Sequence, residues 1–199
     1  DLMNGAFYNR ELLAQTHGCF ACAIRCKRVP RPGARNLDPA YGGPEYETVA
    51  AFGPACGCSD LSAAAKAHER CNALGLDTIS TGMTIAWLME AVERGLITPE
   101  KAGVGGFGDT GGMLSLIEAI ASRQGIGDIL AEGSKRASSI LGFGADFLME
   151  VKGQELPMHD PRGKVGVALG YALAPGGADH MQMAHDTLMA DPEAFGTKS

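Results

Sequence analysis

Residues 59–95 read SDLSAAAKAHERCNALGLDTISTGMTIAWLMEAVERG, and this stretch decides the fold class. Ser59 or Asp60 can cap a helix in which charged and apolar residues separate onto two faces. The apolar face of that helix carries Ala63, Ala64, Ala67, Cys71 and Leu74. Gly75 then stands where the end of a helix favours a left-handed residue. A second helix is predicted over 79–94, and we expect it to be buried because it is apolar over most of its length.

The helical pattern continues beyond this stretch, and little of the chain is typical of β-structure. Two more helices are predicted over 111–125 and 125–142, with a short helical turn at 98–100. Residues 147–151 are the one good strand candidate, and it is short. The Pro- and Gly-rich region 18–58 is expected to be an ordered loop region with little regular structure. The sequence therefore predicts a mainly α fold with a cysteine-containing loop region and little strand.

Composition and charge exclude several classes of protein. The 199 residues include 17 Lys and Arg against 23 Asp and Glu, a net charge of −6, which argues against a nucleic-acid-binding protein. The longest apolar run, around MTIAWLM, is far short of the roughly 20 residues that a membrane-spanning helix needs. The 28 glycines, about twice the usual share, indicate many tight turns and close backbone approaches. We therefore expect a globular chain that wraps around something bulky and binds neither nucleic acid nor a membrane.

Three of the six cysteines are closely spaced. Cys19, Cys22 and Cys26 form a C-x₂-C-x₃-C pattern, in which the thiolates can reach one metal centre as the backbone curls around it. A second two-cysteine knuckle, which structural zinc usually requires, is missing, so we favour a [4Fe-4S] cluster over zinc. A disulfide scaffold fits poorly with a chain that has a sizeable core and no secretory signal. The candidates for a fourth ligand within the chain are Cys56, Cys58 and Cys71, of which Cys71 is more typical of packing.

Four stretches, in order, resemble the aldehyde ferredoxin oxidoreductase family of tungsten, sometimes molybdenum, enzymes with a bis-pterin cofactor. They are GCFACAIRCKRV, YGGPEYETVAAFGPACGCSDL, CNALGLDTISTG and KGQELPMHDPRGKVGVALGYALAPGGADHMQMAHDT. The resemblance covers nearly the whole chain and implies a fold of the family's helical domains. We expect an internal segment, with residues 1–58 forming the iron–sulfur loop region and the start of the helical part. Residues 59–199 would form helical domains that are incomplete at the C-terminus.

The resemblance also implies the ligands of two cofactors. Cys19, Cys22 and Cys26 match the triplet that binds the family's [4Fe-4S] cluster, whose fourth cysteine has no counterpart in this chain. The first pterin-binding loop, D-x-x-G-L-D in the family, is matched by Asn72, Gly75, Leu76 and Asp77, with Asn in place of the leading Asp. An amide both donates and accepts, so this exchange alters the hydrogen-bond pattern without excluding binding. Mg²⁺ is a further candidate cofactor.

Two residues are expected at the reaction centre because of the resemblance. Glu47, with Glu45 as the runner-up, matches an acid near the family's metal that assists proton movement, and His180 matches a histidine near the active site. Without the resemblance, a loop Glu is usually solvated and His180 is as typical of a helix cap or the surface. We expect His159 to belong to a local turn and His68 to lie at the surface.

The resemblance implies an enzyme that oxidises a small aldehyde to a carboxylic acid. Electrons would pass through the [4Fe-4S] cluster to ferredoxin, in the cytoplasm, with the N- and C-terminal parts of the same polypeptide completing the enzyme. An isolated fragment of this length is expected to be inactive. The alternatives are another low-potential reduction on the same scaffold, of an acid or an aromatic thioester, or a non-enzymatic metal-stabilised helical module.

Overall fold

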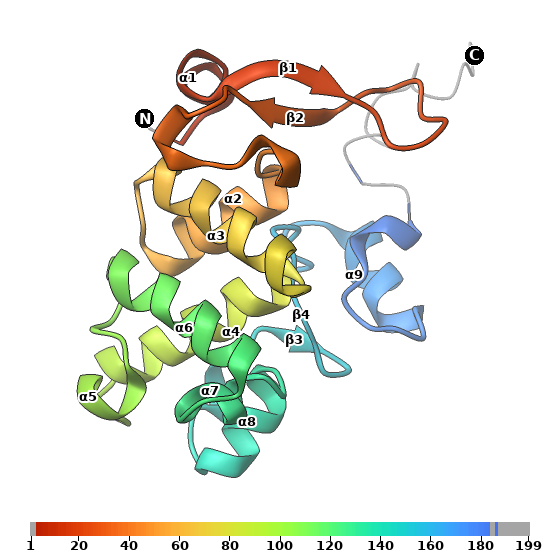
Figure 1. Ribbon diagram of the computed structural model, residues 1–199. Helices are drawn as coiled ribbons and strands as arrows, with labels where there is room; N and C mark the ends of the chain where they lie inside the picture. The colour runs from red at the N-terminus through yellow and green to blue at the C-terminus, as the bar shows by residue number, and fades with distance from the viewer. Residues whose placement is uncertain (1–2, 184–185, 187–199) are drawn as a thin grey trace, which may run out of the picture.

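The computed structural model describes residues 3–183 and 186, and the fold is mainly helical, as predicted (Figure 1). The α-helices are α1 (Gly5–Glu11), α2 (Tyr46–Phe52), α3 (Leu61–Leu74), α4 (Thr78–Glu93), α5 (Pro99–Ala102), α6 (Thr110–Ser122), α7 (Ile126–Leu130), α8 (Ser134–Leu141) and α9 (Val165–Leu173). The strands are β1 (Leu13–His17), β2 (Lys27–Pro30), β3 (Glu150–Val151) and β4 (Gln154–Glu155). Short 3₁₀ turns are η1 (Ala34–Asn36), η2 (Pro39–Tyr41), η3 (Pro54–Cys56), η4 (Ala145–Phe147) and η5 (His180–Gln182).

Helices α3 and α4 begin and end where the sequence predicts. The Asp60 side chain caps α3 by accepting a hydrogen bond from the Ser62 amide at 2.8 Å. Gly75 ends α3 in the left-handed region with a φ of 73°. Asp77 then caps α4 by accepting from the Ser80 amide at 2.7 Å. These caps satisfy backbone groups that a helix leaves unpaired, so the turn between the two helices is fixed by local sequence.

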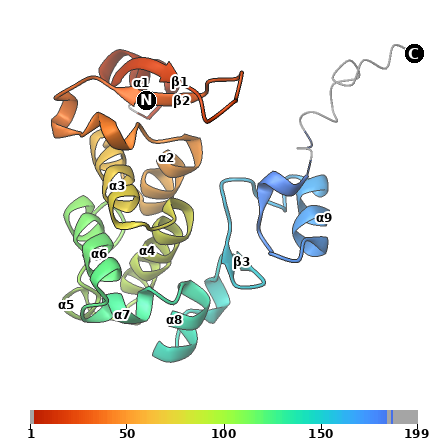
Figure 2. The same ribbon diagram turned by 45° about the vertical axis from the view of Figure 1, so that its right-hand side comes forward.

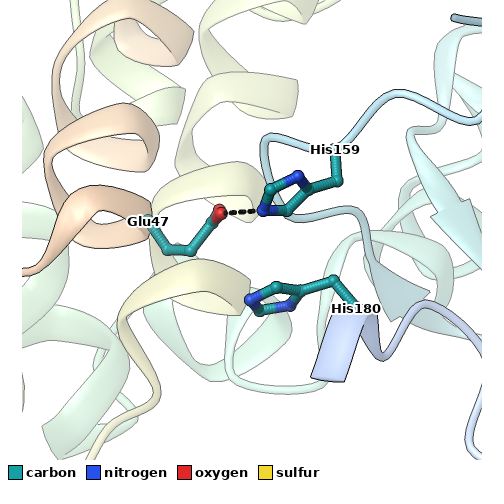
Figure 3. A group of neighbouring side chains, drawn as sticks. All are labelled: Glu47, His159 and His180. Atoms are coloured by element: carbon teal, nitrogen blue, oxygen red, sulfur yellow. Dashed lines mark ion pairs between the residues drawn. The ribbon is translucent and has the colours of Figure 1, made fainter. Parts of the chain in front are cut away.

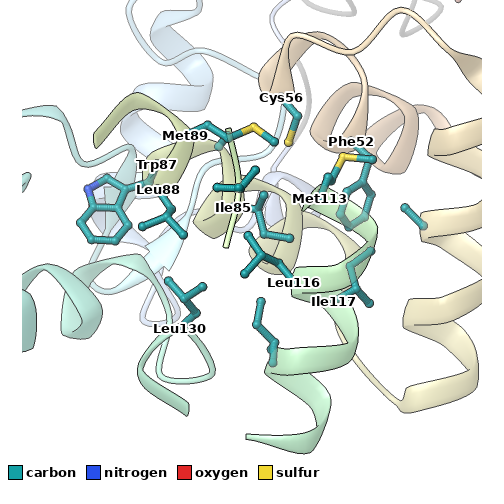
Figure 4. Packing of buried hydrophobic residues seen from close by; sticks show 14 of the residues in the cluster. Phe52, Cys56, Ile85, Trp87, Leu88, Met89, Met113, Leu116, Ile117 and Leu130 are labelled. Carbon is teal, nitrogen blue, oxygen red and sulfur yellow. The ribbon is translucent and has the colours of Figure 1, made fainter. Parts of the chain in front are cut away.

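The main hydrophobic core lies between α3, α4 and α6 and extends to α2 and α7 (Figure 4). Its large, fully buried members include Phe52, Ile85, Leu88, Met89, Met113 and Ile117. Each such side chain contributes about 1.5–3 kcal/mol through removal of apolar surface from water. Because Phe52, Cys56 and Cys58 belong to this cluster, the segment before residue 59 packs into the same core as the helices after it. The domain boundary at residue 58 stays a prediction.

Two regular elements lie inside the region 18–58, where little regular structure was expected. Strand β2 pairs antiparallel with β1, with His17 opposite Lys27, so the cysteine triplet occupies the loop of a β-hairpin. Helix α2 follows Pro44, and its Glu47 lies in the first turn, where an acid is favoured by the helix dipole. Both elements are too short to be stable alone, so β2 depends on its pairing with β1 and α2 depends on its packing into the core. The hairpin covers one end of the helical bundle (Figure 2).

The prediction of one helix over 125–142 was wrong, because the chain breaks into α7 and α8. Gly133 adopts a φ of 83° between them, and the buried carboxylate of Glu155 accepts hydrogen bonds from the Ser134 amide at 2.7 Å and the Ser134 hydroxyl at 2.8 Å. A distant acid thus caps α8. The strand expected over 147–151 is reduced to Glu150–Val151, and helix α9 had not been predicted.

Helix α9 and the loop that precedes it lie to one side of the bundle, reached through the β3–β4 pair (Figures 1 and 2). Within the described part of the chain, no helix combines the length and apolar character needed to cross a membrane. The loop before α9 and turn η5 both face α2, and this arrangement creates the site described below.

Helix α2 approaches α4 closely at Gly82, and this contact fixes the position of α2. A Cβ atom at Gly82 would lie 2.7 Å from the Ala51 Cβ atom. Glu47 lies one turn before Ala51, on the same face of α2.

Gly82→Ala is therefore expected to destabilise the protein by about 1–3 kcal/mol through overpacking, as measured by urea unfolding. The higher helix propensity of Ala would by itself stabilise the protein by about 1 kcal/mol. The sign of the change in unfolding free energy therefore shows whether overpacking or helix propensity dominates. Gly5→Ala is the control, because no atom lies within 4 Å of the added carbon. An unchanged or higher stability for Gly82→Ala would show that α2 does not rest on α4 as described.

Candidate active site

Three side chains from distant parts of the chain meet beside α2: Glu47, His159 and His180 (Figure 3). One potential ligand atom from each lies within 4.8 Å of the others. Glu47 Oε1 lies 2.8 Å from His159 Nε2, and both side chains are about 85% buried, with 14% and 15% of their surfaces exposed. The rings of His159 and His180 stack with centroids 4.9 Å apart and an interplanar angle of 20°. The structure thus brings together the two residues predicted at the reaction centre and adds a third.

The carboxylate of Glu47 is held at both oxygens by the same distant segment. Its Oε2 accepts a hydrogen bond from the Met158 amide at 2.7 Å, beside the contact of Oε1 with His159. Glu45, the runner-up, is instead the N-cap residue of α2. Glu45 has extended backbone angles just before the helix, whereas Glu47 lies in the first turn. This difference favours Glu47 as the residue of the cluster.

His159 had been expected to belong to a local turn, and its place in the cluster was missed. Its Nδ1 lies 3.3 Å from Lys164 Nζ, and its backbone carbonyl accepts a hydrogen bond from the Tyr171 hydroxyl at 3.1 Å. Burial, followed by the charge of Glu47, raises the pKa of Tyr171 to about 12, so this hydroxyl remains a donor at neutral pH. The neighbouring residues of PMHDPRG are typical of a turn, and only the contact across 112 positions to Glu47 gives His159 its role.

The cluster resembles a metal site in composition but not in its surroundings. A histidine that binds a metal usually donates its other ring N–H to a carboxylate, a carbonyl or water. In this protein the other ring nitrogen of His159 faces the ammonium group of Lys164, which can only donate. The arrangement therefore suits a close acid–imidazole pair better than a cation held by all three side chains.

Glu47 lies at the boundary between two cavities. The larger, about 630 Å³, lies between the β-hairpin, η2 and the start of α4 and has a mixed polar lining. The smaller, about 330 Å³, is largely apolar and lies between α2, α4 and the segment 134–162. Glu47 and Ile79 line both cavities. A group in the polar cavity and a group in the apolar cavity would therefore meet at this carboxylate.

The predicted pterin-binding loop lies at the polar cavity. Asn72, Leu76 and Asp77 line it, opposite the cationic side chains of Lys27 and Arg28. The backbone at Gly75 is open, since no atom lies within 4 Å of a Cβ placed there. Amide and carboxylate groups on one wall and cations on the other suit a polar, anionic ligand such as a pterin with its phosphate. The residues present thus fit the cofactor that the sequence predicts.

The amide of Asn72 is oriented by its neighbour His68. Its Nδ2 donates to the His68 carbonyl at 2.8 Å and lies 3.3 and 3.4 Å from the two ring nitrogens of His68. His68 had been expected at the surface, which was wrong: it is buried against the Tyr41 carbonyl, and burial lowers its pKa. With the amide nitrogen engaged, the Asn72 oxygen remains available as an acceptor.

The cysteine triplet lies in the compact loop of the hairpin. Cys19 and Cys26 are exposed and Cys22 is half-buried, and all are free thiols. The loop folds back on itself, because the Cys22 amide bonds to the Cys19 carbonyl at 3.0 Å and a Cβ at Gly18 would lie 2.9 Å from the Cys22 carbonyl oxygen. Three thiols on such a loop fit a shared iron–sulfur cluster. The cluster would lie on the solvent-exposed side of the hairpin loop.

The other three cysteines are part of the core. Cys56, Cys58 and Cys71 are buried in the main hydrophobic cluster, and the Cys56 thiol donates to the Ala51 carbonyl at 3.2 Å. Burial raises the pKa of Cys71 to about 12 and also raises that of Cys56 and Cys58. These thiols are therefore suited to packing, as expected for Cys71, and not to an exposed cluster.

Residues 1–198 match the family described as "Aldehyde ferredoxin oxidoreductase, domains 2 & 3". The chain belongs to the aldehyde ferredoxin oxidoreductase family. It is 42% identical over 192 residues to the tungsten-containing aldehyde ferredoxin oxidoreductase of Pyrococcus furiosus. This match covers 94% of this chain and 30% of that protein. The enzyme of the same description from Thermococcus kodakarensis is 39% identical, over 97% of this chain and 31% of that protein.

One more distant relative and one solved structure are also similar to this chain. The aliphatic sulfonate oxidoreductase, WOR-like subunit, of Pyrococcus furiosus is 28% identical over 89% of this chain and 30% of that protein. The active site complex BamBC of benzoyl coenzyme A reductase superposes with a TM-score of 0.67 at 22% identity, over 86% of this chain and 26% of that chain, and shows the fold alone. The chain spans about a third of the length of the curated relatives that it matches.

Thiol reactivity tests the division of the six cysteines into the accessible triplet of the hairpin loop and the three buried thiols of the core. In the metal-free chain at pH 8, Ellman's reagent is expected to react rapidly with three thiols and with the other three only after denaturation. A raised pKa reduces the thiolate fraction, and burial blocks access of the reagent. Replacing Cys19, Cys22 and Cys26 together by Ser should remove the fast phase. A fast phase that persists in this variant would contradict the assignment.

Proposed function

We propose that this chain is the central helical part of a tungsten- or molybdenum-pterin enzyme that oxidises aldehydes to carboxylic acids. The observation that supports it best is the position of Glu47 between the cavity that fits a pterin and the apolar cavity. We propose that Asn72, Gly75, Leu76 and Asp77 hold one pterin from the polar side. When bound, the metal–pterin group would act as Lewis acid and accept the two electrons of the reaction.

Glu47 and His180 have complementary roles in this proposal. Conversion of an aldehyde and water to a carboxylic acid releases two electrons and two protons. The Glu47 carboxylate would take a proton from the attacking water, since it is largely shielded from solvent and both of its oxygens contact residues 158 and 159. His180, whose ring stacks on that of His159 and which lines a separate small cavity beside Ile79, would donate a hydrogen bond to the aldehyde oxygen. Cys19, Cys22 and Cys26 would hold three corners of the [4Fe-4S] cluster, from which electrons would leave to ferredoxin.

The apolar cavity suits the hydrocarbon part of the substrate. Its walls include Met83, Ala86, Trp87, Phe107 and Phe147. Its charged residues besides Glu47 are in ion pairs: Asp160 with Arg162 at 2.7 Å, and Glu90 with Arg94. A volume of about 330 Å³ accommodates the hydrocarbon part of a ring-sized aldehyde. The largely buried acid–histidine cluster also argues against a purely structural, metal-stabilised module.

The proposal is tested in the full-length polypeptide that carries this segment, loaded with tungsten and iron. Glu47→Gln is expected to lower kcat for cyclohexanecarboxaldehyde by about 10²–10⁴-fold, because the amide cannot accept the proton. His180→Ala should lower it by about 10²–10³-fold through loss of the donor to the aldehyde oxygen. Activity is measured as aldehyde-dependent reduction of viologen dye.

Glu100→Gln is the control for these variants, because Glu100 is exposed in the short helix α5. It should leave activity unchanged. If the loaded wild-type protein reduces no viologen with any aldehyde, or if Glu47→Gln retains full activity, the proposed function is wrong.

A further inference from the structure

Lys164, His159 and Glu47 form a continuous line of polar contacts that joins the start of α9 to α2. Lys164 Nζ lies 3.3 Å from His159 Nδ1, and His159 Nε2 lies 2.8 Å from Glu47 Oε1. Lys164 is the N-cap residue of α9 and contributes no side-chain hydrogen bond to that helix end. Its side chain is thus directed to the imidazole and not to the helix that it precedes.

The chemistry of the lysine decides where the imidazole carries its hydrogen. An ammonium group has three donors and no acceptor, so Nδ1 of His159 must present its lone pair to Lys164. In the neutral ring the hydrogen then lies on Nε2, which faces the carboxylate oxygen of Glu47. The opposite tautomer would set two donors against each other at Lys164 and two acceptors at Glu47. A doubly protonated ring would set Nδ1–H against the ammonium group.

The ring is also fixed in position by groups outside this line. The Tyr171 hydroxyl holds the His159 carbonyl, and the His180 ring stacks on the His159 ring. The Met158 amide holds the second oxygen of Glu47, so a rotation of the carboxylate would break two contacts at once. A single orientation of Glu47 therefore follows from a single tautomer of His159.

We propose that Lys164 is a positioning residue that locks His159 in the Nε2–H tautomer and thereby aims the carboxylate of Glu47. The proposal rests on the proposed function for its effect on catalysis, but not for the tautomer itself. His159 is likewise a positioning residue, and Glu47 remains the catalytic base.

The tautomer is measured by NMR on the full-length polypeptide after labelling its histidines with ¹⁵N. In the wild type, the His159 ring is expected to show a protonated Nε2 and an unprotonated Nδ1. Lys164→Met should give a mixture of tautomers, whereas Lys164→Arg, which also offers only donors, should keep the wild-type pattern. Lys101→Met, in the exposed helix α5, is the matched control and should change nothing at His159.

Kinetics of the loaded full-length polypeptide give the second readout. Lys164→Met is expected to lower kcat by about 10–100-fold with little change in KM, the usual effect of removing a group that orients an active-site side chain. Lys164→Arg should retain most of the activity. His159→Gln, which can still donate to Glu47, should retain more activity than His159→Leu.

The two proposals fail in different ways. A wild-type His159 protonated on Nδ1, or an unchanged tautomer and kcat in Lys164→Met, would overturn the role of Lys164. A protein that shows the expected tautomers but oxidises no aldehyde would support the positioning by Lys164 and overturn the proposed function.

Discussion

The carboxylate of Glu47 is the point on which the arrangement of this protein depends. It lies in the first turn of α2, yet both of its oxygens meet groups from residues 158 and 159, more than a hundred positions later. Burying a carboxylate costs free energy unless polar groups contact its oxygens, so residues 158 and 159 stabilise Glu47 where they lie against α2. This contact joins the helical bundle to the separate group of elements around α9 (Figure 2), and it defines the boundary between the two cavities.

The rest of the fold supports this carboxylate in a specific place. The close approach of α2 to α4 at Gly82 fixes the helix that carries Glu47, and the capped turn from Gly75 to Asp77 places the predicted pterin loop on the other side of the polar cavity. The hairpin brings cations to that cavity and carries the cysteine triplet on its loop. Polar and apolar surfaces are thereby separated on the two sides of one acid, which suits a reaction between a polar cofactor and an apolar aldehyde.

Local signals in the sequence predicted much of this, and contacts between distant residues account for the remainder. Helices α3 and α4 follow from Asp60, Gly75 and the apolar face between them, because capping and periodicity are local. The break before α8 depends on Glu155, and the hairpin depends on pairing of β1 with β2, neither of which is visible in a short window. Glu47 and His180 were predicted through resemblance to the family. His159 was missed because its own neighbours indicate only a turn.

The central claim is that Glu47 separates a cofactor side from a substrate side. The most direct test is a crystal structure of the loaded full-length polypeptide with cyclohexanecarboxylate, the product of a ring-sized aldehyde. The account predicts that the carboxylate of this product lies beside Glu47 and His180, with its ring against Trp87 and Met83 and the pterin against Asn72 and Asp77. A product ring among Lys27, Arg28 and Asn72, or a pterin in the cavity beside Trp87, would contradict it.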